Sequence, residues 1–210
     1  MARRGTLLVL GGLLTQLLSG FACGAQMQRD RSPVDLVVAT DDSWLVTANQ
    51  TSNTVSLVRT SDGKVLDESQ AGVHPTAICL APDGKTVLVS ARDAGEVRIF
   101  QVDGDRLVAG DVICVGFHPH GIAVSPDGRQ AYVALAAAAQ VAVIDLQQAT
   151  VIRRIEVGQW PRYLALSPDG SRLAVGVSGD RGVSVIDTKL GEQVFLERFV
   201  GLNIGHLAAS

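Results

Sequence analysis

The chain has 210 residues, enough for one domain with a sizeable core. Hydrophobic residues make up 47% and charged residues 19%, a balance that indicates a globular protein and excludes a mainly disordered one. The formal net charge is -3, and residues 26–210 alone carry 16 basic against 21 acidic groups. An acidic chain without a basic cluster argues against a nucleic-acid partner.

Residues 1–25 are predicted to be a secretory signal peptide. Two arginines supply positive charge near the start, a short apolar stretch follows, and small residues then offer cleavage sites. The apolar stretch is short for a membrane span, so an uncleaved anchor is the alternative. A lipid anchor on Cys23 is disfavoured, because Gly20 stands where a large aliphatic residue is usual. We expect a periplasmic or extracellular protein, in which residues 26–32 form a polar linker.

After the linker the sequence predicts short strands joined by turns. Many of these turns contain Asp-Gly, in which glycine supplies the positive φ that a tight hairpin needs. Residues 136–139 are four alanines, but they align with turns elsewhere in the chain and are predicted to be a loop. The expected strands are 33–39, 44–49, 54–59, 64–69, 76–81, 86–91, 96–101, 106–113, 120–125, 130–135, 140–145, 150–156, 162–167, 172–177, 182–187 and 192–199.

A repeated pattern organises these strands. A loop with a fixed proline, an apolar strand and a Pro-Asp-Gly turn occur together at 72–84, 116–128 and 158–170, and the pattern starts again at 201. Matching Asp42 to the turn aspartates 83, 127 and 169 gives spacings of 41, 44 and 42 residues. A period of about 40–45 residues with four strands per unit is typical of a β-propeller blade.

The predicted fold class is therefore all-β, a propeller of four-stranded antiparallel blades. Because a single four-stranded sheet hides neither face, each blade must stack on its neighbours. The strands agree with this, since many are apolar on both sides. The expected blades are 33–71, 72–115, 116–157 and 158–200, and the first strand of a fifth blade begins at 201.

Several segments resemble the YVTN-type β-propeller repeat family, which is part of the WD40-like repeat superfamily. They are Leu45–Asn49 with Thr54–Val58, Val141–Asp145, Val183–Asp187 and the Pro-Asp-Gly turns. The resemblance covers residues 33–210 and implies a scaffold rather than an activity. Propellers of this family usually close with about seven blades. We therefore expect further blades or a downstream domain beyond those visible here, with a ring of several chains as the alternative.

Two cysteines of the expected second blade are predicted to remain unpaired. Cys79 falls on its first strand and Cys114 at the end of its last strand. Strands three positions apart in a sheet are separated by about 14 Å, whereas a disulfide needs Cα atoms within about 7 Å. Cys79 is therefore expected to behave as a small core residue.

The loops before the first strands are the expected ligand site, because in a propeller they gather at one mouth of the central channel. Imidazoles at such a mouth are able to hold a metal ion or haem iron. Side chains on different blades are nevertheless too far apart to share one ion, so no metal site and no catalytic residue are predicted. The candidate ligand-binding residues are His74, His118, His120, Trp160, Arg162 and His206.

The Pro-Asp-Gly aspartates Asp83, Asp127 and Asp169 are assigned to the turns, where Asp accepts backbone hydrogen bonds. The sequence contains no Gly-x-Ser-x-Gly, His-Glu-x-x-His, phosphate-binding loop or Cys-x-x-Cys-His. We therefore predict a non-catalytic exported binding or scaffold module, without a cofactor, that recognises a protein or small ligand at the channel mouth.

Family resemblance leaves an enzyme as the alternative function. Similar propellers form the haem domain of bacterial nitrite reductases, are joined to c-type cytochrome or peroxidase domains, or act as lactonases. In that alternative this chain is the propeller portion of a redox enzyme or of a propeller lactonase, and haem or a metal ion is the expected cofactor.

Overall fold

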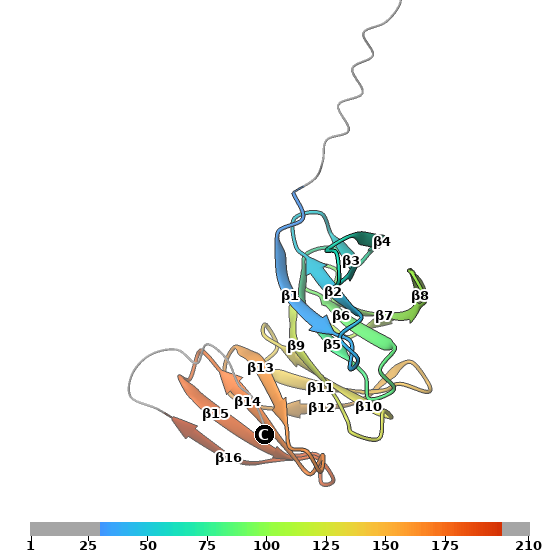
Figure 1. Ribbon diagram of the computed structural model, residues 1–210. Helices are drawn as coiled ribbons and strands as arrows, with labels where there is room; N and C mark the ends of the chain where they lie inside the picture. Colours follow the sequence, from blue (N-terminus) through green and yellow to red (C-terminus); the bar gives the residue numbers. More distant parts are fainter. Residues whose placement is uncertain (1–29, 199–210) are drawn as a thin grey trace, which may run out of the picture.

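A computed structural model describes residues 30–198, which form sixteen strands in four antiparallel sheets (Figure 1). Within each sheet the four strands are neighbours in sequence order. Residues 136–139 form a turn, as the sequence predicts. No helix in this range is long and apolar enough to cross a membrane. The expected signal peptide, the expected fifth-blade strand and His206 lie outside the described residues.

The observed strand bounds lie within two residues of the predicted ones. Prolines 75, 119 and 161 each begin a strand, a position where the missing N–H is tolerated. The strands are β1 (Pro33–Val38), β2 (Trp44–Asn49), β3 (Thr54–Arg59), β4 (Val65–Gln70), β5 (Pro75–Leu80), β6 (Thr86–Ala91), β7 (Glu96–Asp103), β8 (Arg106–Cys114), β9 (Pro119–Val124), β10 (Gln130–Leu135), β11 (Gln140–Asp145), β12 (Thr150–Glu156), β13 (Pro161–Leu166), β14 (Arg172–Val177), β15 (Gly182–Asp187) and β16 (Glu192–Arg198).

The apolar cores lie between neighbouring sheets. Successive residues of a strand point to opposite faces, so one strand serves two cores. In β6, Val87 and Val89 pack into the core shared with the first sheet, whereas Leu88 between them packs into the core shared with the third sheet. A third core joins the third and fourth sheets and contains Tyr132 and Val175. The prediction that blades stack face to face is confirmed.

The inner strands β1, β5, β9 and β13 follow one another side by side along the inside of the arc (Figure 1). Polar contacts connect them from sheet to sheet. The Asp35 carboxylate accepts a hydrogen bond from the Ile78 N–H at 3.0 Å, and the Thr76 hydroxyl donates to the Pro119 carbonyl oxygen at 3.0 Å. The relative position of adjacent inner strands is therefore fixed by hydrogen bonds as well as by packing.

The β1–β2 turn corrects the alignment of the first repeat, because matching Asp42 to Asp83 is wrong. Asp41 Oδ1 accepts a hydrogen bond from the N–H two residues on at 3.1 Å, as Asp83 Oδ1 does at 2.9 Å. Asp42 instead takes the place of Gly84, with a φ of 58° against 70°. Asp is one of the few residues that adopt this left-handed conformation readily, which explains the substitution.

Cys79 and Cys114 lie on β5 and β8, the first and last strands of one sheet, and both are free. Cys79 is half-buried against the core between the second and third sheets. Burial raises the pKa of its thiol, which agrees with a core role. Cys114 is exposed.

The first and fourth sheets each have an apolar face that no other described residue covers. Val37 packs into the first core, so its neighbour Leu36 points the opposite way and is 52% exposed. At the other end of the arc, Leu196 packs into the third core and its neighbour Phe195 is 51% exposed. Within residues 30–198 the propeller is therefore an open arc with two apolar ends.

Gly121 of β9 allows the close approach of β9 and β13. A methyl group there would lie 2.3 Å from the Arg162 carbonyl oxygen, so Gly121→Ala must push two backbones apart. We expect its free energy of unfolding in urea to fall by about 1–3 kcal/mol. Gly110→Ala in β8 is the control, because its methyl group would meet the nearest atom at 3.4 Å; we expect a change within about 0.5 kcal/mol. Equal losses in both variants would contradict this role of Gly121.

Candidate functional site

The channel-mouth loops share one backbone conformation. His74, His118 and Trp160 each precede the proline that begins an inner strand, and their φ angles are 55°, 54° and 53°. The carbonyl oxygen of each accepts a hydrogen bond from the N–H that follows the second strand of the same sheet, at 2.9–3.0 Å. Such φ values are uncommon outside glycine. Ser32 adopts the same conformation in the first sheet, with a φ of 47°. The conformation is therefore common to all four sheets.

His74 is tied to the neighbouring turn by its side chain and by its backbone. Its Nδ1 lies 2.5 Å from Asp93 Oδ2, while Arg92 Nε donates to Asp93 Oδ1 at 2.8 Å. These two hydrogen bonds, that from Arg92 first, lower the pKa of Asp93 to about 2. The backbone N–H of His74 donates to Asn53 Oδ1 at 2.9 Å. Asp93 therefore orients the His74 ring through its Nδ1 atom.

His120 lies half-buried in β9 among positive charges. Burial, and then the charges of Arg162, Arg92 and His118, lower its pKa from 6.5 to about 4. The imidazole is therefore neutral at pH 7. The structure thus brings together three of the predicted site residues, His118, His120 and Arg162, and adds Arg92, which was not among the candidates.

Two exposed aromatic residues lie close in sequence to His118 and Arg162. Phe117 directly precedes His118 and is 81% exposed. Trp160, at the equivalent of His118 in the next loop, is 59% exposed. Phe117 was not among the sequence candidates, although its position beside a candidate histidine was the available signal. Exposed aromatic residues next to arginine are the composition that binding surfaces favour.

The described donors do not fit a metal ion. Among residues 30–198, no group of three or more His, Cys, Asp or Glu lies close enough to hold one. The arginines that lower the His120 pKa would also repel a cation at that imidazole. The mouth is instead suited to a negatively charged group.

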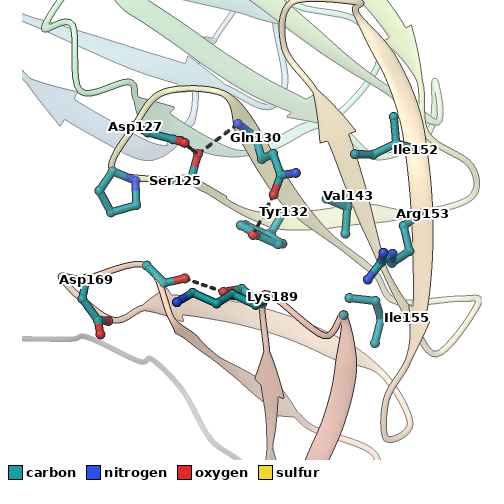
Figure 2. Close-up of a pocket in the computed structure, with 14 residues that line it drawn as sticks. Ser125, Asp127, Gln130, Tyr132, Val143, Ile152, Arg153, Ile155, Asp169 and Lys189 are labelled. Carbon is teal, nitrogen blue, oxygen red and sulfur yellow. Dashed lines mark hydrogen bonds between the residues drawn. The ribbon is translucent and has the colours of Figure 1, made fainter.

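A concavity lies at the opposite rim, between the third and fourth sheets (Figure 2). It has a volume of about 410 Å³, and no sequence feature pointed to it. Several of its polar groups already have partners: the Tyr132 hydroxyl donates to Gln130 Oε1 at 3.1 Å, and Arg153 Nη1 donates to the Leu190 carbonyl oxygen at 2.8 Å. The first bond lies within β10 and the second connects the third and fourth sheets, so we assign the concavity to blade packing.

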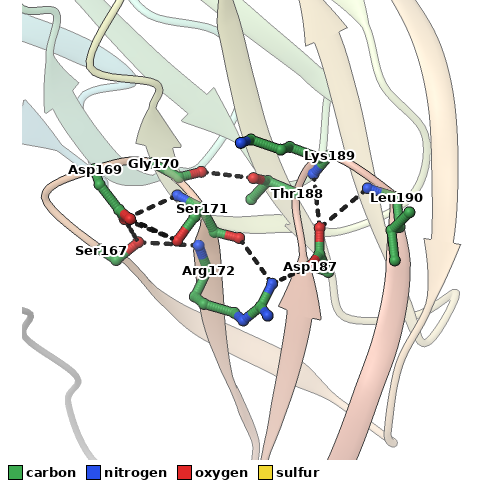
Figure 3. A network of polar contacts seen from close by, with 9 residues as sticks. All are labelled: Ser167, Asp169, Gly170, Ser171, Arg172, Asp187, Thr188, Lys189 and Leu190. Atoms are coloured by element: carbon green, nitrogen blue, oxygen red, sulfur yellow. Dashed lines mark hydrogen bonds and ion pairs between the residues drawn. The ribbon is translucent and has the colours of Figure 1, made fainter.

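The Pro-Asp-Gly turns at this rim use their carboxylates structurally (Figure 3). Asp169 Oδ1 accepts hydrogen bonds from the Ser167 hydroxyl at 2.6 Å and from the Ser171 N–H at 3.0 Å, and these bonds lower its pKa to about 2. Asp83 and Asp127 accept the corresponding backbone bonds at 2.9 and 3.0 Å. All three aspartates serve the turns to which the sequence assigned them.

Comparisons with known proteins agree with this architecture. A family model described as a YNCE-like beta-propeller matches residues 27–172. The structure of Kuenenia stuttgartiensis hydrazine synthase is 29% identical, with a TM-score of 0.75; the match covers 86% of this chain and 53% of that one. A functionally unknown protein from Desulfotomaculum acetoxidans DSM 771 has the same fold at 21% identity and a TM-score of 0.68, over 82% of this chain and 56% of that one.

The chain therefore spans about half the length of both solved structures. A search of curated proteins gives no significant match.

The low pKa of His120 predicts a stability that depends on pH. Between about pH 4 and 6.5 the unfolded chain binds a proton that the folded imidazole excludes. Stability is therefore full above pH 6.5 and falls as the pH drops through this window, by at most about 1.4 kcal/mol per pH unit from this group. Urea unfolding from pH 4.5 to 7.5 should show that His120→Gln removes this component, whereas the exposed-site control His118→Gln retains it. If the free energy of unfolding falls equally with pH in the wild type and in His120→Gln, His120 is not the source of the pH dependence.

Proposed function

Because this chain belongs to the YNCE-like β-propeller family, whose shared feature is a scaffold, we propose that it is a non-catalytic binding module. It recognises a protein or small ligand at the channel mouth. The observation that carries this proposal is the pair of exposed aromatic side chains, Phe117 and Trp160, beside the cations of the mouth. An exported location is part of the proposal and rests on the signal-peptide pattern of residues 1–25.

The mouth has the physical properties of a binding surface. Removing apolar surface from water contributes about 25 cal/mol per Å², so covering Phe117 and Trp160 would favour association. The backbone before each proline is held by a hydrogen bond to the adjacent turn, which limits the entropy lost when a ligand orders the loop. Trp and Arg are also the side chains most enriched among residues that dominate binding energy.

The turn carboxylates support binding rather than catalysis. They already accept several hydrogen bonds each. A general base must instead be free to accept a proton from the substrate.

The likeness to hydrazine synthase favours a second candidate, in which this propeller is the non-catalytic portion of a redox enzyme. In that case a haem would be held by parts of the protein other than the described donors. An absorption spectrum of the full-length exported protein separates the two candidates. A Soret band would support the redox candidate, whereas a colourless protein would leave the binding module.

We further propose that additional blades cover the two apolar ends of the arc. The supporting observations are the exposed Leu36 and Phe195 faces and the greater length of the two matching structures. Burying such faces is what stabilises a stack of blades. The occupant we favour is further blades of the same polypeptide.

Mass spectrometry of the mature protein from its native source tests this. We expect a mass well above that of residues 26–210. A monomer of the smaller mass would contradict the proposal, and an oligomer of chains of the smaller mass would replace it with a ring of several copies.

Site-specific photocrosslinking tests the proposed function. With a photoreactive residue at position 117, we expect a crosslinked product in the native compartment, identified by mass. Trp160→Ala in the same chain should reduce its yield by roughly tenfold or more, the loss expected for a residue that dominates binding. The matched control places the photoreactive residue at Leu190, which is exposed on the opposite rim. Equal products at both positions, or none at 117, would contradict the proposal.

A further inference from the structure

We propose that the channel mouth binds an oxyanion, a carboxylate or phosphate group of the ligand, between Arg162 and Arg92, and that in acidic solution His120 takes up a proton as the anion binds. The inference rests on the proposed function, because it names the chemical group that the mouth recognises. It concerns the same site, and it adds a mechanism that can be measured on the free protein.

Three sheets bring these side chains together. His120 and Arg162 are the second residues of β9 and β13, two inner strands that approach so closely that Gly121 has no room for a Cβ atom beside the Arg162 carbonyl. The Ser90 hydroxyl holds the His120 carbonyl oxygen from the second sheet. Arg92 directly follows β6 in that sheet, and its N–H donates to the His74 carbonyl oxygen at 2.9 Å. The backbone on all sides of the site is therefore fixed before a ligand arrives.

The charge at this position is only partly balanced, because Arg92 forms an ion pair with Asp93 whereas Arg162 has no carboxylate partner within residues 30–198. The groups close enough to affect His120 are Arg162 from β13, Arg92 from the β6–β7 turn and His118 from its own loop, and none is acidic. No carboxylate pairs with the Arg162 guanidinium within residues 30–198. Asp93 occupies only Nε of Arg92, so in the same range the two terminal nitrogens have no hydrogen-bond partner.

Guanidinium groups suit an oxyanion because their planar set of donors matches two oxygens at once. A carboxylate or phosphate at this position would be held by charge-assisted hydrogen bonds. Phe117 and Trp160 beside it would contact an apolar part of the same ligand. The site therefore favours a ligand that carries an oxyanion next to an apolar group.

The proton uptake follows from the same charges. In the free protein, burial and then the neighbouring positive charges, that of Arg162 first, lower the pKa of His120 to about 4, so its imidazole is neutral at pH 7. A bound anion brings the opposite charge, which favours the protonated imidazole and raises its pKa. By linkage, the anion binds more tightly as the pH falls and His120 becomes protonated. Because the pKa of His120 in the free protein is about 4, anion binding and protonation of this histidine are coupled near pH 4–5 and not at pH 7.

NMR of the His120 ring on the full chain tests the proposal. Its pKa is measured in formate, in inorganic phosphate and in chloride at equal ionic strength. We expect formate or phosphate to raise the pKa by about one unit or more relative to chloride, the size expected for an adjacent opposite charge. The arm that gives the larger shift identifies carboxylate or phosphate as the preferred group.

Two matched variants complete the test. Arg162→Gln should raise the His120 pKa in chloride, because a positive charge is lost, and should abolish the anion-dependent shift. Arg129→Gln removes an exposed arginine at the opposite rim and should change neither quantity. No shift with either anion, or a full shift in Arg162→Gln, would overturn the oxyanion site. Crosslinking at position 117 without an anion-dependent shift of the His120 pKa would overturn the oxyanion site but leave the proposed binding function in place. A shift of the His120 pKa without crosslinking would support the oxyanion site and contradict the proposed binding function.

Discussion

Burial of both faces of every sheet is the constraint on which the rest of this structure depends. A four-stranded sheet with Val87 and Val89 on one side and Leu88 on the other is apolar on both, so only neighbouring sheets can remove it from water. Stacking in sequence order then places each first strand on the inside of the arc. As a result, the loops before the first strands of successive sheets lie at the same end of the arc.

The two rims of the arc have different electrostatic states. At the Pro-Asp-Gly rim, carboxylates such as Asp169 are saturated by hydrogen bonds within their own turns. At the mouth, Arg162 has no carboxylate partner within residues 30–198, and His120 lies in a positive environment. A chain with a net charge of -3 thus carries positive charge around His120 at the opposite end of the strands from the Pro-Asp-Gly turns.

Most of the fold was predictable because the repeat supplies several independent copies of each signal. The Asp42 alignment failed because turn geometry, which a single sequence does not display, places Asp41 at the position of Asp83. The sequence predicted where the mouth loops lie in the fold, but not which charged groups surround His120. Arg92 lies in a different loop from His120, so their proximity and the depressed pKa depend on contacts across sheets. Periodicity carries no information about such contacts.

The residue before each inner-strand proline shows how recognition is able to evolve on this scaffold. Ser32, His74, His118 and Trp160 adopt one left-handed backbone, although their side chains differ in size, charge and polarity. The conformation is held by a carbonyl hydrogen bond, so it depends little on the side chain attached. Selection, or directed evolution in the laboratory, can therefore exchange these residues for other unbranched types and redesign specificity blade by blade. Each blade therefore offers one position at which the side chain varies while the backbone conformation stays the same.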